Sequence, residues 1–130
     1  MQIVVDTSAV LAVLLGQPER ETILSLTAGC DLIAPASMTA EIGNALSALF
    51  KKRHITLEQA EQVLANYDGQ HLRFCPLDLP RSVRIAHDLG IYAYDAYMVE
   101  LAERMRCHLL TLDQRLVSHS RNYGLRVLEV

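Results

Sequence analysis

Short apolar runs alternate along the chain with longer stretches in which hydrophobic residues recur every three or four positions. The runs are rich in Leu and β-branched residues and predict strands, whereas the longer stretches predict amphipathic helices. No two runs are joined by the short glycine-containing turn of a β-hairpin, so we expect parallel strands. The predicted strands cover Gln2–Asp6, Asp31–Ala34, Leu72–Leu77, His108–Leu112 and Arg126–Val130.

Proline, glycine and capping residues mark where the predicted helices begin and end. Pro18 and Pro80 suit first helical turns. Thr56 and Gln59 have the spacing of a capping box, and Gly69 is predicted to end the helix that follows. The helices are predicted from Ser8 to before Gly16, over Glu19–Ala28 and Ser37–Arg53, from Thr56 to Gly69, from Pro80 to Gly90, and over Tyr94–Arg106 and Gln114–Asn122.

This alternation of strands and helices predicts an α/β fold. Right-handed crossovers between parallel strands place helices on both faces of the sheet, which gives a three-layer α/β/α sandwich. We expect residues 1–130 to form a single domain with a mostly parallel five-stranded sheet of order 3-2-1-4-5. Strands one and four are then neighbours where the chain reverses its direction of travel, and ligands bind outside the strand ends at such a point. Asp6 and Asp113 end those two strands.

The chain is rich in apolar residues for a domain of its size. Hydrophobic residues make up 51% of the 130 positions, and the mean hydropathy is +0.16. We expect part of this apolar surface to contact another chain. Cys30, Cys75 and Cys107 are odd in number and lie in apolar runs, so we predict reduced core residues. No run reaches the roughly 18 apolar residues of a membrane helix and no basic segment precedes Asp6, so we expect a cytoplasmic protein.

The acidic balance of the chain limits how it could bind nucleic acid. The formal net charge is −3 and the pI is near 5.9, which argues against broad electrostatic attraction to phosphates. A metal-dependent nuclease is not excluded, because clustered carboxylates lower the charge of the bare chain and bound cations reverse the local sign.

Four carboxylates fall where a parallel sheet would bring them together. Asp6 and Asp113 end two predicted strands, and Glu41 and Asp95 lie at the starts of two predicted helices. Each acid has a local explanation, as a helix cap, an Asx turn or a solvated charge in a first turn. Independent caps have no reason to meet at one crevice, so the joint placement favours a shared site.

Such a site would require a cation. Carboxylates within several ångströms repel one another, and a hard divalent ion relieves the repulsion. Mg²⁺ prefers oxygen ligands and retained waters, so four acids suffice for one ion or a bridged pair. Such ions activate water and stabilise the leaving oxygen of a phosphodiester, which makes a phosphodiester-cleaving enzyme the leading hypothesis. Ser8 and Thr111 lie close to two of the acids and could support them, although a helix cap and a strand threonine explain them equally well.

A basic cluster lies at the far end of the helix that Glu41 begins. Lys51, Lys52 and Arg53 are roughly 18 Å from Glu41 at a rise of about 1.5 Å per residue, which suits contact with a neighbouring phosphate of a bound strand. Cations at a helix C-terminus are also favoured by the macrodipole, so a purely structural role stays open.

The aromatic residues show no stacking pattern for RNA in the sequence. Tyr92, Tyr94 and Tyr97 flank Asp95, and packing alone would explain them. The histidines show no zinc-type spacing, and no glycine-rich phosphate loop is present.

Four short motifs around the acids occur in a familiar order and spacing. They are Val4-Val5-Asp6-Thr7-Ser8-Ala9, Glu41-Ile42-Gly43-Asn44-Ala45-Leu46, Tyr94-Asp95-Ala96-Tyr97 and Leu110-Thr111-Leu112-Asp113. Together they resemble the PIN-domain ribonucleases, and among these the VapC toxins of bacterial toxin–antitoxin pairs. The resemblance spans residue 3 to about residue 116. It implies that the four acids Asp6, Glu41, Asp95 and Asp113 bind the metal and act in catalysis, with Ser8 and Thr111 in support.

The resemblance also implies an activity and partners. Such a protein is a Mg²⁺- or Mn²⁺-dependent endoribonuclease that forms a homodimer and is inhibited by a small antitoxin whose tail fills the acidic groove. The antitoxin often presents an arginine to the carboxylates, as expected of a guanidinium that replaces a cation. Asn44, one helical turn after Glu41, could contact the RNA or a carboxylate.

Two other functions fit the residues less well, and a third stays open. A receiver-type phosphotransfer module needs a lysine on strand five, but the only lysines are Lys51 and Lys52. A haloacid-dehalogenase-like phosphatase needs an acid two residues after its nucleophilic aspartate, where this chain has Ser8. A non-catalytic module that binds a basic partner peptide in the acidic groove stays open, because the same carboxylates would serve both functions.

Overall fold

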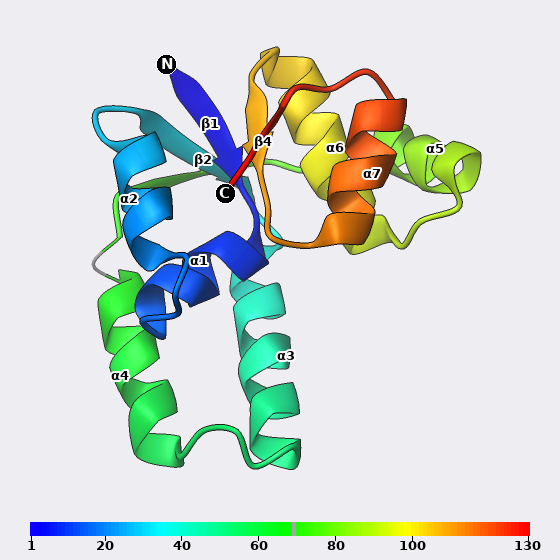
Figure 1. Ribbon diagram of the computed structural model, residues 1–130. Coiled ribbons are helices and arrows are strands. Elements are labelled where there is room, and N and C mark those ends of the chain that lie inside the picture. Colours follow the sequence, from blue (N-terminus) through cyan, green and yellow to red (C-terminus); the bar gives the residue numbers. More distant parts are fainter. Residues whose placement is uncertain (69) are drawn as a thin grey trace.

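The computed structural model describes residues 1–68 and 70–130 and has the predicted α/β/α arrangement. The strands are β1 (Gln2–Val5), β2 (Asp31–Pro35), β3 (Leu72–Cys75), β4 (His108–Leu110) and β5 (Val127–Leu128). The helices are α1 (Thr7–Leu14), α2 (Arg20–Thr27), α3 (Met38–Lys51), α4 (Leu57–Asp68), α5 (Leu79–Leu89), α6 (Ala93–Met105) and α7 (Gln114–Asn122). Figure 1 shows the sheet between α1, α2 and α4 on one side and α5, α6 and α7 on the other, with α3 and α4 extending beyond it. None of the helices within the described ranges is long and apolar enough to cross a membrane.

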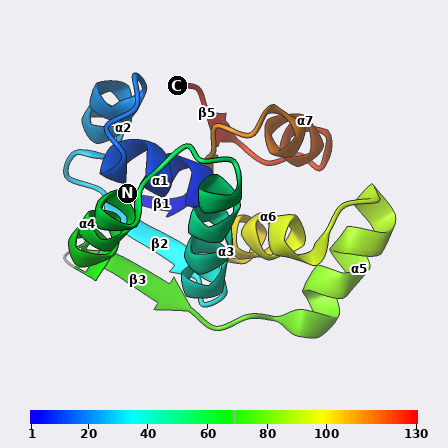
Figure 2. The same ribbon diagram turned by 90° about the horizontal axis from the view of Figure 1, so that it is seen from below.

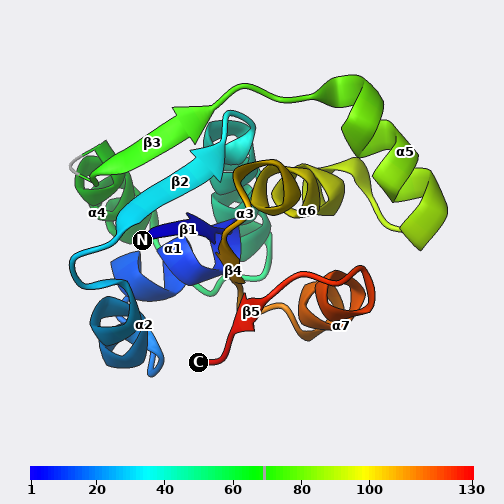
Figure 3. The same ribbon diagram turned by 90° about the horizontal axis from the view of Figure 1, so that it is seen from above.

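The sheet has the strand order that the sequence predicted. All neighbouring strands pair in parallel in the order β3-β2-β1-β4-β5, which Figure 3 shows across the molecule. Ile3 pairs with Leu32 on one side and His108 on the other, so β1 lies at the centre. The Asp6 N–H donates to the Leu110 carbonyl at 3.1 Å, which continues the pairing one residue beyond β1. The ends of β1 and β4 are therefore adjacent at the predicted reversal.

Several strands are shorter than predicted. β1 ends at Val5 because Asp6 turns to become the N-cap of α1. β3 ends at Cys75 and not at residue 77, since the following Pro76 has no N–H to donate to a neighbouring strand. The predicted strands 108–112 and 126–130 are reduced to His108–Leu110 and Val127–Leu128, so the edge strand β5 is very short.

Left-handed backbone conformations end several helices. Gly90 has φ +65° and caps the C-terminus of α5, as predicted. Arg53 and Arg106 have φ of 56° and 51°, so the helices expected to run to these residues end before them. The capping box is confirmed, since Thr56 and Gln59 each accept a hydrogen bond from the other's backbone N–H. The predicted helix stop at Gly69 lies outside the described residues.

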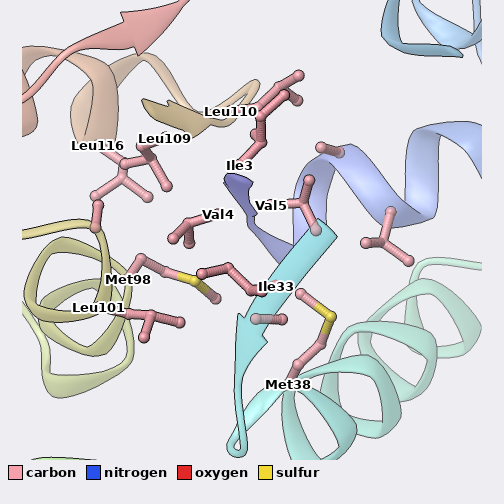
Figure 4. Packing of buried hydrophobic residues seen from close by; sticks show 14 of the residues in the cluster. Ile3, Val4, Val5, Ile33, Met38, Met98, Leu101, Leu109, Leu110 and Leu116 are labelled. Carbon is pink, nitrogen blue, oxygen red and sulfur yellow. The ribbon is translucent and has the colours of Figure 1, made fainter. Parts of the chain in front are cut away.

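The core lies between the sheet and the helices on its two faces. Figure 4 shows its centre, to which the strands contribute Ile3, Val4, Val5, Ile33, Leu109 and Leu110, and the helices contribute Met38, Met98, Leu101 and Leu116. Of the three free cysteines, Cys75 and Cys107 are buried as predicted, whereas Cys30 is only partly buried.

Polar contacts fix α6 in its place. Arg104 donates from Nε to the buried carboxylate of Glu100 at 2.8 Å and from Nη2 to the Pro76 carbonyl at 2.8 Å. Arg81 of α5 pairs with Glu103 at 3.1 Å. These contacts join α6 to α5 and to the segment between β3 and α5, which Figure 3 shows on the outer side of α6. The orientation of the first turn of α6 is thereby set from its far end.

We predict that Leu101→Ala lowers the free energy of unfolding by about 2–5 kcal/mol, because Leu101 is fully buried and the change leaves a cavity. The matched control is Leu57→Ala on α4, where the side chain is 65% exposed and the change should stay within about 0.5 kcal/mol. Urea unfolding of both variants measures the difference. Equal effects would contradict the core position of Leu101.

Candidate acidic site

The four predicted acids come from four segments that meet at the carboxyl end of the sheet. Asp6 and Asp113 are the N-caps of α1 and α7, and Glu41 and Asp95 lie in the first turns of α3 and α6. Figure 2 views the molecule from this end, with α1, α3, α6 and α7 grouped there. Each acid is therefore placed by the start of a helix, and the suggestion that Asp95 itself caps α6 is wrong, because Tyr92 is the N-cap residue.

The buried carboxylate of Asp6 accepts three hydrogen bonds. Its exposed fraction is 6%. Its Oδ1 accepts from Ser8 Oγ at 2.6 Å and from the Ala9 N–H at 3.1 Å, and its Oδ2 accepts from Thr111 Oγ1 at 2.5 Å. A buried carboxylate with three donors can remain charged, since hydrogen bonds to the charged form offset part of the cost of leaving water.

Ser8 and Thr111 do more than cap a helix or extend a strand. Each hydroxyl donates to Asp6 and accepts a backbone N–H from the segment between β4 and α7: Leu112 N–H lies 3.0 Å from Ser8 Oγ, and Asp113 N–H lies 3.1 Å from Thr111 Oγ1. The two hydroxyls thus fix the segment that carries Asp113 relative to Asp6. The sequence suggested that both residues support the acids, and that role in the site stays a prediction.

Two hydroxyls that the sequence did not single out hold Glu41. Thr7 Oγ1 donates to Glu41 Oε1 at 3.2 Å, and Ser37 Oγ donates to Glu41 Oε2 at 2.8 Å. Thr7 belongs to α1, so its contact ties Glu41 to the turn that follows β1. Only one of these two contacts could have been found from the sequence. Ser37 and Glu41 are four residues apart at the start of a helix, whereas Thr7 is 34 residues from Glu41.

Burial and neighbouring charge raise the pKa of three of the acids. Burial is the largest cause for Asp6, and the charge of Asp113 adds to it, while the hydrogen bonds from Ser8, Thr111 and Ala9 oppose it. Burial also raises the pKa of Glu41, with contributions from Asp6 and Asp95, against the hydrogen bonds from Ser37 and Thr7. For Asp95, burial and then the charge of Asp113 raise the pKa, and His119 lowers it. The acids thus neighbour one another in four pairs, Asp6–Asp113, Asp6–Glu41, Glu41–Asp95 and Asp95–Asp113, and we call the four together the acidic ring.

The four acids of the ring are not arranged as a metal-coordination sphere. Within residues 1–68 and 70–130, no group of three or more His, Cys, Asp or Glu side chains has the geometry to hold a metal ion. One cause is visible in the contacts: the oxygens of Asp6 and Glu41 face hydroxyl donors, and Asp113 Oδ1 accepts from the backbone N–H groups of Arg115 and Leu116. The donor chemistry fits Mg²⁺ or Mn²⁺, because all four side chains offer hard oxygen ligands. Gathering three of them on one ion requires side-chain rotation.

A groove of about 400 Å³ lies between α1 and α3, and of the four acids Asp113 contributes to its lining. Its walls include Ser8 and Asp113 at one end and Lys52 at the other, with an apolar lining of Leu11, Leu15, Ala45, Ala48, Leu49 and Leu112. Lys51 and Arg53 are exposed beside Lys52. Asn44 is exposed on α3, and the hydrogen bonds found in the described ranges include none from its side chain, so the predicted contact with a carboxylate is not formed.

The fold and the placement of the four acids define an α/β domain with an acidic site at the switch point of a 3-2-1-4-5 sheet. The family model of the PIN domain matches residues 3–122, and the chain belongs to this family. None of the curated proteins matches the sequence.

Solved structures show the same fold at low sequence identity. PAE2754 from Pyrobaculum aerophilum is 20% identical with a TM-score of 0.66, and the match covers 98% of this chain and 83% of that one. VapBC2 from Rickettsia felis, solved with a DNA fragment of its promoter, is 16% identical with a TM-score of 0.68, covering 98% of both chains. VapC20 from Mycobacterium tuberculosis, described as a toxin that cleaves the sarcin–ricin loop, is 17% identical with a TM-score of 0.67, again covering 98% of both.

We predict that Asp95→Asn stabilises the protein without divalent ions at neutral pH and that this gain disappears in acid. Because the pKa of Asp95 is raised on folding, its stabilising contribution is fully present below its ordinary pKa of 3.8 and is lost as the pH rises through the raised value. Removing the charge therefore helps only above that range. Chemical unfolding across pH measures the effect. Asp31→Asn, at the exposed start of β2, is the control, and a gain for Asp95→Asn that persists in acid would contradict the prediction.

Proposed function

We propose that this protein is a Mg²⁺- or Mn²⁺-dependent endoribonuclease that acts as the toxin of a type II toxin–antitoxin pair. The observation that carries the proposal is the placement of four carboxylates, from four segments, at the starts of four helices at the carboxyl end of the sheet. Membership of the PIN family and the fold shared with VapC structures support a nuclease of this kind. The proposal places its action in the cytoplasm, with RNA as the substrate.

Each acid has a part in the proposed reaction. Asp6, Glu41, Asp95 and Asp113 would hold the ion, which when bound supplies Lewis-acid polarisation of the phosphodiester and activation of the attacking water. Asp6 is held by its three donors. Its Oδ1 already accepts two hydrogen bonds, whereas its Oδ2 accepts one and keeps a second lone pair available for the ion. Ser8 and Thr111 keep Asp6 and Asp113 in register, so that both carboxylates face the same crevice.

The groove between α1 and α3 supplies the proposed path for the RNA. Its lining includes Asp113 of the acidic ring and Lys52, and Lys51 and Arg53 extend that basic end. A strand whose scissile phosphate lies at the acids would place neighbouring phosphates toward these cations, which offset the repulsion at the crevice. Asn44, exposed on the same helix, would contact the strand between them.

The same surfaces suit the proposed partners. An antitoxin segment would pack apolar side chains on the leucines and alanines of the groove and present an arginine to the carboxylates, where a guanidinium replaces a cation. The proposal also includes a homodimer. Exposed apolar residues on α5, such as Leu79 and Val83, each 53% exposed, provide surface for contact with another chain.

We predict cleavage of RNA that depends on Mn²⁺ or Mg²⁺ and on the ring of acids. With total cellular RNA as the probe, sequencing of newly formed ends should show discrete cleavage sites. Asp6→Asn and Asp95→Asn should each lower the rate about a hundredfold or more, because each removes a charge that holds the ion. Glu58→Gln, in the exposed first turn of α4, is the control and should keep full activity.

The outcome that contradicts the nuclease is tight binding of a basic, arginine-containing peptide together with no cleavage under any divalent ion. That result would favour the non-catalytic module that binds a basic partner in the acidic groove. Cleavage that survives both Asp→Asn changes would instead move the active site away from the ring.

We predict that Thr7→Val weakens Mn²⁺ binding about tenfold, because Glu41 loses the donor that orients it from α1. Thr7→Ser keeps the hydroxyl and should bind Mn²⁺ as the wild type does. Thr22→Val, on the exposed surface of α2, is the control for the loss of a threonine hydroxyl. Calorimetric titration gives the affinities, and unchanged binding by Thr7→Val would show that the contact does not position Glu41.

A further inference from the structure

Tyr94 stands where the sheet-facing side of α6 extends past the ends of the strands. Figure 4 shows Met98 and Leu101 pointing from α6 into the core, where their exposed fractions are 2% and 0%. Tyr94 precedes them by four and seven residues, so the helical period places it on the same side of α6. Yet Tyr94 is 48% exposed, because the first turn of α6, which it shares with Asp95, lies beyond the strands. An exposed aromatic side chain on the core-facing side of α6 therefore lies in the same helical turn as Asp95 and directly precedes it in the chain.

The ring of Tyr94 is held in place by a second aromatic residue. Tyr97 lies three residues further on and is partly buried, and the two ring centroids are 6.0 Å apart at an interplanar angle of 80°. This edge-to-face contact is a favoured aromatic geometry and limits the motion of Tyr94. Tyr92, the N-cap residue of α6, is 86% exposed and adds a further aromatic side chain next to the same turn. Packing therefore explains Tyr97 but not the exposure of Tyr92 and Tyr94.

Binding of RNA next to the acidic ring requires a favourable interaction other than attraction between charges. The chain has a net charge of −3, and the acids of the ring repel phosphate when no cation is bound. The basic end of α3 is at the far end of the groove. Stacking of a base on an aromatic ring is independent of net charge and tolerant of sequence. In a duplex the bases are already stacked on their neighbours, so only an unpaired base can use such a ring.

We propose that Tyr94, supported by Tyr97, is a base-stacking residue that holds an unpaired nucleotide next to the phosphodiester at the acidic ring. Tyr92 provides a second stacking surface for a flanking base. This inference rests on the proposed ribonuclease function and deepens it, because it names a residue that would contact a base of the RNA next to the acids. It also assigns the exposed aromatic surface to RNA and not to a second copy of the chain.

The test measures binding and stacking separately from cleavage. The probe is a fluorescein-labelled single-stranded RNA of mixed sequence, about 10 nucleotides long, titrated in EDTA at low salt, with a duplex of the same sequence for comparison. Tyr94→Leu should weaken binding of the single strand about tenfold or more, whereas Tyr94→Phe and Tyr94→Trp should bind as the wild type does. Binding of the duplex should be weak and equal for all four proteins. Phe74→Leu, which removes a 43% exposed ring from the edge strand β3, is the matched control.

A spectroscopic signature distinguishes stacking from a structural role. An oligonucleotide that contains 2-aminopurine should lose fluorescence when it binds the wild type or Tyr94→Trp and keep it with Tyr94→Leu. Melting curves establish whether each variant is folded. If Tyr94→Leu does not fold, the test still has the variants Tyr94→Phe and Tyr94→Trp, which keep an aromatic ring.

The inference is overturned if Tyr94→Leu binds the single-stranded RNA as tightly as the wild type does, or if 2-aminopurine keeps its fluorescence when it binds the wild type. A variant that changes only the sedimentation coefficient would assign Tyr94 to an interface between copies of the chain. If the wild type cleaves RNA and Tyr94→Leu has no effect on binding, only the stacking role is wrong. If the wild type neither binds nor cleaves RNA, the proposed ribonuclease function is wrong as well.

Discussion

The turn after β1 carries the contacts on which the acidic site depends. Its three successive side chains make three contacts with two other parts of the fold. Asp6 accepts from Thr111 and Ser8 accepts from the Leu112 N–H, both in the segment between β4 and α7, and Thr7 donates to Glu41 of α3. Successive residues at the start of α1 point in directions about 100° apart, so one turn can serve all three. Because β1 is also the central strand, this turn connects the core of the sheet directly to the site.

Helix geometry explains how four negative charges can lie near one another before any cation binds. Each acid is at the N-terminus of a helix, either as the cap of α1 or α7 or in the first turn of α3 or α6. The unpaired N–H groups and the positive end of the helix dipole favour an anion at each of these places. Capping and a shared site are therefore not alternatives, since the local contacts that explain each acid also reduce the cost of bringing all four together.

The sequence predicted the parts of this arrangement that follow from periodicity. Alternating strands and helices predict parallel pairing, and the common doubly wound order makes β1 and β4 neighbours, which is why Asp6 and Asp113 could be placed together. Thr7 could not be assigned to Glu41, because a hydroxyl contact across 34 residues leaves no local pattern. The exposure of Tyr94 was equally hidden, since it depends on where β1, β2 and β4 end relative to α6. The strand ends were the least accurate part of the prediction.

Charge and base stacking would act at different stages of selecting the proposed RNA substrate. Long-range electrostatics acts first and would draw RNA toward the basic end of α3, not toward the acids. Stacking acts only at contact, so Tyr94 would act on RNA that has already reached the crevice. Attraction by Lys51, Lys52 and Arg53 depends on salt and is the same for every sequence, because phosphates are identical. Discrimination between paired and unpaired RNA would then come from the aromatic residues next to Asp95, while the acids themselves contribute chemistry and little selectivity.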